Sequence, residues 1–226
     1  MKLPSEKTLK LIYEYEVGGG KQYYNKFLKT FTWPGLQSGP TIGIGIDCAY
    51  YSQEELESLF SFLPPSWLDL VKKCTGKKGA VGKEYTAVLQ KAGIEMPWET
   101  AQKVFLDTTW TKFARLTDQV FPGASDLCDD AYGALVSLVF NRGASLTGAS
   151  RLEMRKIKDL VPIKNYARIA AQIRSMKRLW EGKNASGLLK RRDAEADLVL
   201  ECTQKKLTGP RDWLRRAAVI TPTKRK

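Results

Sequence analysis

The chain has 226 residues, of which 43% are hydrophobic and 27% charged, and its formal net charge is +13. This composition is that of an ordinary globular protein, and no apolar run is long enough to span a membrane. The sequence contains no histidine, which excludes Ser-His-Asp and Cys-His hydrolases and His-ligated zinc hydrolases. A hydrolase built from this chain would therefore depend on carboxylates.

Residues 5–17 are predicted to form the first helix, with Ser5 as its N-cap and apolar residues at helical spacing. Glu16 stands at the end of this helix, one residue before three consecutive glycines. Lysines and glutamates interrupt the N-terminal segment, which therefore lacks the apolar core of a signal peptide. We expect synthesis in a cytoplasm and, if the protein acts elsewhere, release or injection by another route.

Residues 39–47 alternate apolar β-branched residues with glycines and are predicted to form one short strand. Thr41 and Asp47 are six residues apart, so both would face the same side of that strand. A hairpin is expected over about 27–46, with residues 34–39 as its loop. A hairpin strand of any α+β domain is an open alternative, and Asp47 could instead cap the turn that follows.

The rest of the chain is predicted to be helical, from capping residues, proline positions and apolar periodicity. The expected helices cover residues 52–62, 67–73, 83–91, 97–120, 126–141, 150–160, 162–180 and 187–206. The segment 126–141 is the most apolar, and Gly143 is expected to end it. The fold class is therefore α+β and mainly helical, with a small β-hairpin lobe (about 18–50) and a larger helical lobe within a domain over 1–204.

A basic extension over residues 205–226 carries eight Lys or Arg and one Asp, which is more than half of the net charge. It implies an anionic partner, either nucleic acid or a bacterial envelope, whereas a merely solvated surface is the simpler interpretation for the rest of the chain. The four cysteines, Cys48, Cys74, Cys128 and Cys202, are too far apart for a Cys-x-x-Cys metal site. Three disulfide pairings are possible, but we expect buried thiols in a reduced compartment.

A carboxylate at a helix end, a second one after a strand and a hydroxyl between them form a layout suited to glycoside hydrolysis. Three segments, 41–45 (Thr-Ile-Gly-Ile-Gly), 140–143 (Phe-Asn-Arg-Gly) and 187–195, occur in the order found in phage-type lysozymes. The chain resembles that family over most of its length. It departs from the family in lacking an aspartate before the threonine and in having Ile46 where a histidine usually follows the strand.

The spacing of the threonine and the later aspartate is more similar to that of pesticin-type bacteriocin muramidases. The resemblance implies a two-lobed lysozyme-like fold and an N-acetylmuramidase, which cleaves the β-1,4 bond between N-acetylmuramic acid and N-acetylglucosamine without a cofactor. It also implies that an arginine of the last helix, Arg191 or Arg192, pairs with the catalytic glutamate. The implied catalytic residues are Glu16, Asp47 and Thr41, and the implied substrate-binding residues are Arg142 and Arg191.

The implied setting is a phage endolysin or an antibacterial effector that acts on peptidoglycan in the periplasm or cell wall. An effector would be accompanied by an immunity protein. We expect a monomer that attaches to the anionic envelope through its basic C-terminus and binds no nucleic acid. The alternatives are a chitosanase- or chitinase-like glycosidase and a non-catalytic, basic protein that binds an envelope or nucleic acid.

Overall fold

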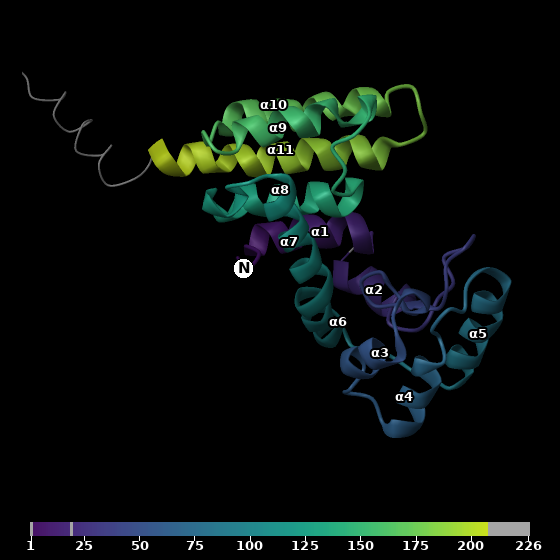
Figure 1. The fold of residues 1–226 in the computed structure, drawn as a ribbon. Helices are drawn as coiled ribbons and strands as arrows, with labels where there is room; N and C mark the ends of the chain where they lie inside the picture. Colours follow the sequence, from purple (N-terminus) through teal and green to yellow (C-terminus); the bar gives the residue numbers. More distant parts are fainter. Residues whose placement is uncertain (1, 19, 208–226) are drawn as a thin grey trace, which may run out of the picture. The chain divides into compact units, whose positions relative to one another are not determined.

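The computed structural model describes residues 2–18 and 20–207, and the chain divides into two compact units. Unit 1 consists of Met1–Leu11 and Lys112–Lys226, and unit 2 of Ile12–Thr111. Helix α1 (Glu6–Val17) runs from the first unit into the second (Figure 1). Most described residues are helical and one two-stranded sheet is present, which confirms the expected fold class. Over the described ranges, no helix has the length and apolarity that crossing a bilayer requires.

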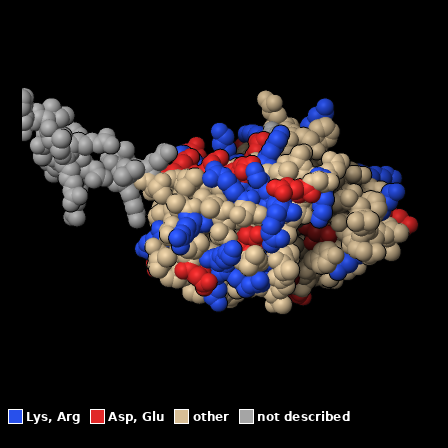
Figure 2. All heavy atoms as spheres, turned by 90° about the horizontal axis from the view of Figure 1, so that it is seen from above, with Lys and Arg blue, Asp and Glu red and all other residues tan. Residues whose placement is uncertain are grey.

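Charges of both signs are mixed on the surface. Figure 2 shows Lys and Arg interspersed with Asp and Glu over the face that it draws. At the surface of unit 2, Lys72 pairs with Glu57 (2.7 Å) and Lys29 pairs with Glu95 (2.7 Å). Exposed pairs of this kind contribute about 0–1 kcal/mol each to stability.

Unit 1 is a set of helices packed around α8 (Asp129–Arg142) and α11 (Ser186–Leu207). In Figure 1, α11 lies between α8 on one side and α9 (Leu152–Leu160) and α10 (Tyr166–Ser175) on the other. All residues of α8 from Asp130 to Val139 are buried, as its apolar sequence predicts. Other elements of this part of the chain are α7 (Thr111–Val120) and the short 3-10 helices η3 (Ala124–Asp126), η4 (Ala149–Arg151) and η5 (Met176–Leu179).

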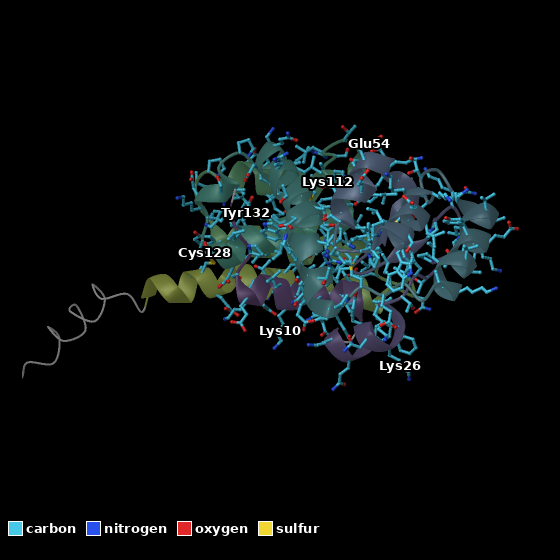
Figure 3. All side chains as sticks on the ribbon, turned by 90° about the horizontal axis from the view of Figure 1, so that it is seen from below. Lys10, Lys26, Glu54, Lys112, Cys128 and Tyr132 are labelled. Atoms are coloured by element: carbon cyan, nitrogen blue, oxygen red, sulfur yellow. A yellow bond between two sulfur atoms is a disulfide. The ribbon has the colours of Figure 1, made fainter. Side chains whose placement is uncertain are left out.

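Two contacts fix the neighbours of α8. The start of α1 approaches α8 closely at Gly133, where a Cβ would lie 2.7 Å from the Cβ of Thr8. The Thr8 backbone N–H donates to Ser5 Oγ (3.1 Å), which confirms Ser5 as the N-cap. On α8 itself, the hydroxyl of Tyr132 (labelled in Figure 3) lies 3.3 Å from Asp118 Oδ2 of α7.

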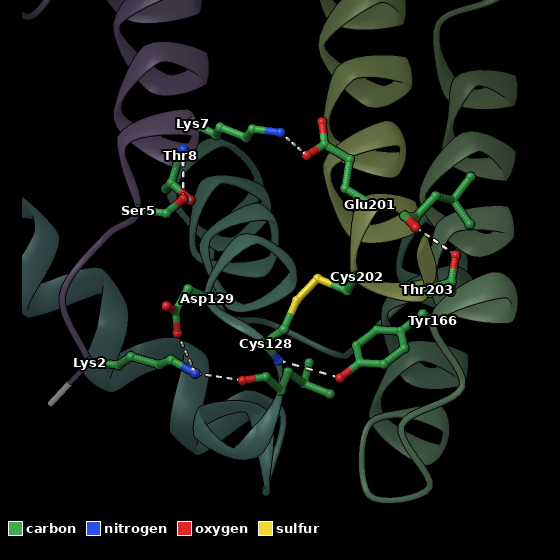
Figure 4. The surroundings of a disulfide bond; sticks show 12 residues. Lys2, Ser5, Lys7, Thr8, Cys128, Asp129, Tyr166, Glu201, Cys202 and Thr203 are labelled. Atoms are coloured by element: carbon green, nitrogen blue, oxygen red, sulfur yellow. Dashed lines mark hydrogen bonds and ion pairs between the residues drawn. A yellow bond between two sulfur atoms is a disulfide. The ribbon is translucent and has the colours of Figure 1, made fainter. Parts of the chain in front are cut away.

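The structure contains a disulfide between Cys128 and Cys202, with 6.2 Å between their Cα atoms (Figure 4). The expectation of four reduced thiols is therefore wrong for this pair. Cys128 precedes α8 and Cys202 lies near the end of α11, so the packing of these two helices brings together residues 74 positions apart. Cys48 and Cys74 are buried thiols, as expected.

Unit 2 contains shorter helices, several of which begin at the predicted signals. The Ser52–Glu55 capping box is confirmed: Ser52 Oγ accepts from the Glu55 N–H (3.2 Å), and Glu55 Oε2 accepts from the Ser52 N–H (2.7 Å). The elements are α2 (Gly20–Phe27), η1 (Cys48–Tyr50), α3 (Gln53–Leu59), α4 (Pro65–Lys72), α5 (Gly79–Lys91), α6 (Trp98–Phe105) and the π-helical segment η2 (Leu106–Trp110).

The helix predicted over 97–120 is interrupted by η2. There, Thr108 Oγ1 donates to the carbonyl of Val104 (2.7 Å), and Thr111 Oγ1 donates to the carbonyl of Leu106 (3.0 Å). Threonine hydroxyls that bind preceding carbonyls compete with the regular helical ladder. A π-turn therefore replaces the α-helix at this point.

The prediction of one strand over 39–47 is wrong. Two strands, β1 (Thr41–Ile42) and β2 (Ile46–Asp47), pair in antiparallel fashion instead. Gly43 (φ +69°) and Gly45 (φ +76°) lie in the left-handed region, where glycine carries no steric penalty. The glycines therefore make a turn, and Gly43 also leaves room for the side chain of Met96.

The larger hairpin predicted over 27–46 is present only in part. Thr32 forms an isolated antiparallel bridge with Thr41, and their backbones exchange hydrogen bonds of 2.7 and 2.8 Å. Phe27, where this hairpin was expected to begin, is the last residue of α2, and Thr30 forms an isolated bridge with Glu95 and not with the other arm.

Candidate active site

Glu16 is the penultimate residue of α1, and its side chain is exposed. The same helix is anchored by Tyr13, three residues before Glu16, whose ring packs edge-on against Trp98 (5.1 Å between centroids) and Phe105 (5.8 Å). Gly18 (φ +64°) then ends the helical path. Aromatic packing thus holds the end of α1 in place, and the Glu16 side chain at this end is exposed.

The segment around Met96 contacts both α2, the helix that follows Glu16, and the turn between β1 and β2. The Tyr24 hydroxyl of α2 donates to the Met96 carbonyl (2.7 Å), and burial raises the pKa of Tyr24, which keeps this donor protonated. The Met96 N–H donates to the carbonyl of Lys29 (2.8 Å). A Cβ on Gly43 would lie 2.9 Å from Met96 Sδ, so the turn packs directly on this side chain.

Thr41 and Asp47 are directly opposite each other in the antiparallel pair. Their side chains therefore share one face of the hairpin, as predicted, although as cross-strand partners and not as residues of one strand. Asp47 also caps η1, because its Oδ1 accepts from the Ala49 N–H (3.1 Å). The capping role left open by the sequence is thus present in the structure.

Gly39 binds both of these side chains and was not predicted to take part in the site. Its N–H donates to Asp47 Oδ1 (3.1 Å) and Oδ2 (3.0 Å), and its carbonyl accepts from Thr41 Oγ1 (3.1 Å). A Cβ at this position would lie 2.7 Å from the Lys77 carbonyl and 2.8 Å from Asp47 Oδ1. Only glycine fits, and the sequence signal for this was a Gly-Pro pair in front of the strand.

Arg142 ends α8 in unit 1 and is half-buried. Its Nη2 donates to the Ser150 carbonyl (2.7 Å), and its guanidinium lies 5.0 Å from the ring centroid of Trp180. Burial, together with the nearby cations Arg151 and Arg192, lowers the pKa of Arg142 to about 10. Its buried Nε has no acceptor among the described residues.

Arg191 lies inside unit 1, with 3% of its surface exposed. It donates to Glu195 Oε1 (3.2 Å) and to Ser137 Oγ (3.1 Å), and Arg192 donates to the same Glu195 oxygen (3.0 Å) and to Asn141 Oδ1 (3.1 Å). Substrate binding by Arg191 stays a prediction, and this burial favours an indirect, positioning role. Glu195 and Ser137 were not predicted as partners of Arg191. The sequence signal for the pairing was the position of Glu195, four residues after Arg191 and three residues after Arg192 on a buried helix face.

A cleft of about 560 Å³ in unit 2 contains none of the predicted site residues. It is lined by the end of α3, one face of α6 and η2. The charged groups on its walls are paired, Glu99 with Lys21 (2.6 Å) and Lys103 with Asp107 (2.5 Å), so it offers no free catalytic carboxylate. Within residues 2–18 and 20–207, no group of three or more Cys, Asp or Glu side chains is arranged to hold a metal ion.

The family model described as phage lysozyme matches residues 69–195, which is more than half of the chain. The chain belongs to the phage lysozyme family. It is accordingly a glycoside hydrolase of the lysozyme type, with peptidoglycan as its substrate, and the predicted lysozyme-like fold is confirmed. The match includes Arg142 and Arg191 but not Glu16, Thr41 or Asp47, so the pesticin-like catalytic layout stays a prediction. No curated protein matches the chain.

Proposed function

We propose that this lysozyme is an N-acetylmuramidase in which Glu16, Thr41 and Asp47 carry out the reaction. The observation that supports this proposal most strongly is the direct pairing of Thr41 with Asp47 across the hairpin. Side chains opposite each other in such a pair have Cβ atoms about 4.5–5.5 Å apart. That separation allows one water molecule to bind both.

The hydrogen bonds of the pair define how that water would be held. Asp47 Oδ1 accepts two backbone N–H bonds and Oδ2 accepts one, which leaves a lone pair on Oδ2. The Thr41 hydroxyl already donates to Gly39, so its oxygen is an acceptor toward solvent. A water that donates one hydrogen to each oxygen keeps its own lone pair for attack, with Asp47 as general base.

Glu16 would act as the general acid that protonates the leaving glycosidic oxygen. Its exposed side chain is accessible to a glycan strand, and it belongs to the same unit as the Thr41–Asp47 pair. Because a water must fit between the sugar and the base, the two carboxyl groups should be about 6.5–9.5 Å apart, as in inverting glycosidases. The reaction would then invert the configuration of the anomeric carbon.

Arg142, half-buried beside Trp180, is proposed to bind an anionic group of peptidoglycan through the accessible part of its guanidinium. Arg191 would support the site indirectly, through its buried bonds to Glu195. The pairing of Glu16 with an arginine of α11, which the family resemblance implies, stays a prediction.

The proposed setting is bacteriolysis, by a phage endolysin or an antibacterial effector with an immunity protein. The enzyme would act in the periplasm or cell wall as a monomer, held near the anionic envelope by the basic residues 205–226. Most of that segment, residues 208–226, lies outside the described residues.

Digestion of purified peptidoglycan tests the activity. We expect fragments with N-acetylmuramic acid at their reducing ends, and NMR of a fresh digest should show the α-anomer first. N-acetylglucosamine at the reducing ends would contradict the muramidase assignment. A β-anomer as first product would contradict the role of Asp47 as a base that activates water.

A further inference from the structure

The two thiols of unit 2 lie next to each other in its interior. Cys48 and Cys74 are both fully buried, and Cys74 lies near enough to Cys48 to contribute to the raised pKa of the Cys48 thiol. Cys48 is the first residue of η1, directly after Asp47, and Cys74 follows the end of α4. A backbone hydrogen bond from the Gly76 N–H to the Ala49 carbonyl (3.0 Å) holds the two segments together beside the two thiols.

We propose that Cys48 and Cys74 form a second disulfide when the protein folds in an oxidising compartment. The chain already contains the Cys128–Cys202 disulfide in unit 1, so it is suited to such a compartment. The proposed bond would close a loop that contains α3 and α4. It would also tie η1, which Asp47 caps, to the segment after α4.

The reaction is thiol–disulfide exchange with an oxidant of the disulfide class, such as oxidised glutathione. The thiolate of one cysteine attacks the oxidant disulfide, forms a mixed disulfide and releases one thiolate. The second cysteine then attacks its partner's sulfur in the mixed disulfide and releases the other thiolate. Two electrons pass to the oxidant, and the protein's two thiol protons, exchanged through solvent, convert the two released thiolates into thiols.

The timing follows from burial. Inside the folded unit, neither sulfur is accessible to a bulky oxidant, and burial, with further contributions from Cys74 and Asp47, raises the pKa of Cys48. A thiol that stays protonated is a poor nucleophile. The bond should therefore form before unit 2 closes, and once formed it should resist reductants.

The bond would stabilise the support of the Thr41–Asp47 pair. The segment after Cys74 contacts Gly39, because the Gly79 N–H donates to the Ser38 carbonyl (3.1 Å) and the Lys77 carbonyl lies against Gly39. This inference does not depend on the proposed catalytic roles. Its test identifies the disulfide bonds directly and requires no measurement of enzymatic activity.

The test is peptide mapping of the full chain after refolding from the reduced, denatured state in a glutathione redox buffer. Free thiols are alkylated under denaturing conditions before digestion. We expect a Cys48–Cys74 peptide pair, a Cys128–Cys202 pair and no alkylated cysteine. Alkylated Cys48 and Cys74, or pairs exchanged between the units, would overturn the proposal.

Two further experiments test when the bond forms and how much it stabilises the protein. When the oxidant is added only after the reduced chain has folded, Cys48 and Cys74 should stay alkylatable; equally fast oxidation would overturn the coupling to folding. Cys74→Ala should lower the melting temperature, relative to the natural chain, by about 5–10 °C when both proteins are refolded with the oxidant, and by clearly less when both are refolded and kept in excess reductant. An equal loss in both conditions would show that only packing was removed. Cys202→Ala is the matched control, in which the Cys48–Cys74 pair should still form.

Discussion

At the scale of single residues, Asp47 has two roles that have to be separated. Its carboxylate caps η1 and binds Gly39, and it is also the proposed base. Backbone N–H donors fix the orientation of the carboxylate, which serves either role. The structure alone therefore shows a well-held carboxylate, and its chemistry has to be tested by substitution.

Asp47→Asn should lower both stability and activity. An amide nitrogen in place of Oδ2 would face the Gly39 N–H donor against donor, so the bond to Oδ2 is lost at a cost of about 1–3 kcal/mol. Loss of the base should reduce the rate by about two to four powers of ten. Urea unfolding and release of reducing ends measure the two effects.

Thr41→Val is the matched control, because it keeps the β-branched shape and removes the hydroxyl. It should reduce the rate with a smaller loss of stability. If Asp47→Asn is destabilised but fully active at a temperature where it is folded, Asp47 is a helix cap and not the base.

At the scale of elements, the contact between α8 and α11 depends on the buried carboxylate of Glu195. One of its oxygens accepts from Arg191, Arg192 and Ser137 Oγ (2.7 Å). Glu195→Ala should destabilise the protein by about 3–5 kcal/mol, because it leaves buried guanidinium charge without this carboxylate. Chemical denaturation measures the loss.

Glu201→Ala is the control on the same helix, since the Glu201 carboxylate pairs with Lys7 where both side chains are partly exposed. It should cost no more than about 1 kcal/mol. Equal losses for Glu195→Ala and Glu201→Ala would contradict the structural importance of the buried network.

Glu153 should make unit 1 sensitive to acid. Burial raises the pKa of its carboxyl, but the bonds from Arg178 (Nε to Oε1, 2.5 Å; Nη2 to Oε2, 3.1 Å) outweigh burial, so the pKa is lowered overall. A lowered pKa means that the stabilisation is complete above the unfolded value of about 4.3 and is lost as pH falls through the folded value.

Thermal unfolding between neutral and acidic pH measures this contribution. The Glu153→Gln variant should lose less stability than the natural chain as pH falls below the ordinary range of a carboxyl group. Parallel curves for the two proteins would show that Glu153 does not contribute to the pH dependence.

The helices were predictable because their signals are local. Ser5, Ser52 and the apolar run of α8 act within a few residues of their position in the sequence, and α1, α3 and α8 begin close to the predicted residues, whereas α2 was not predicted. The hairpin register was not predictable, because Gly43 and Gly45 are compatible with either a strand or a turn. The choice depends on contact with Met96, some fifty residues away in the chain.

Dependence on distant contacts also explains which features of the site could not be predicted from the sequence. Tertiary packing sets the proximity of the segments that three features join. These features are the cross-strand pairing of Thr41 with Asp47, the hydrogen bonds of Gly39 and the Cys128–Cys202 disulfide. Residue types and spacing identified Thr41 and Asp47 as candidates. Gly39, which binds both side chains, was identified only from the structure.

At the scale of the whole molecule, the distribution of charge is uneven along the sequence, because residues 205–226 carry more than half of the net charge. Removal of residues 221–226, which include Lys224, Arg225 and Lys226, should weaken binding to whole peptidoglycan or outer membrane at low salt. Hydrolysis of short soluble glycans should change little. The difference should disappear as salt screens the charges. Unchanged binding at low salt would contradict a role of these residues in attachment.

The central claim is that this lysozyme cleaves peptidoglycan by carboxylate catalysis with Glu16 as the acid. The most direct measurement compares the natural chain with Glu16→Gln in digestion of purified peptidoglycan, with mass analysis of the fragments. The amide keeps the shape of the side chain at an exposed position, so the melting temperature should be unchanged, but it cannot donate the proton. We expect a rate reduced by about two to four powers of ten. Near-normal release of muramic-acid ends by the folded variant would contradict the claim.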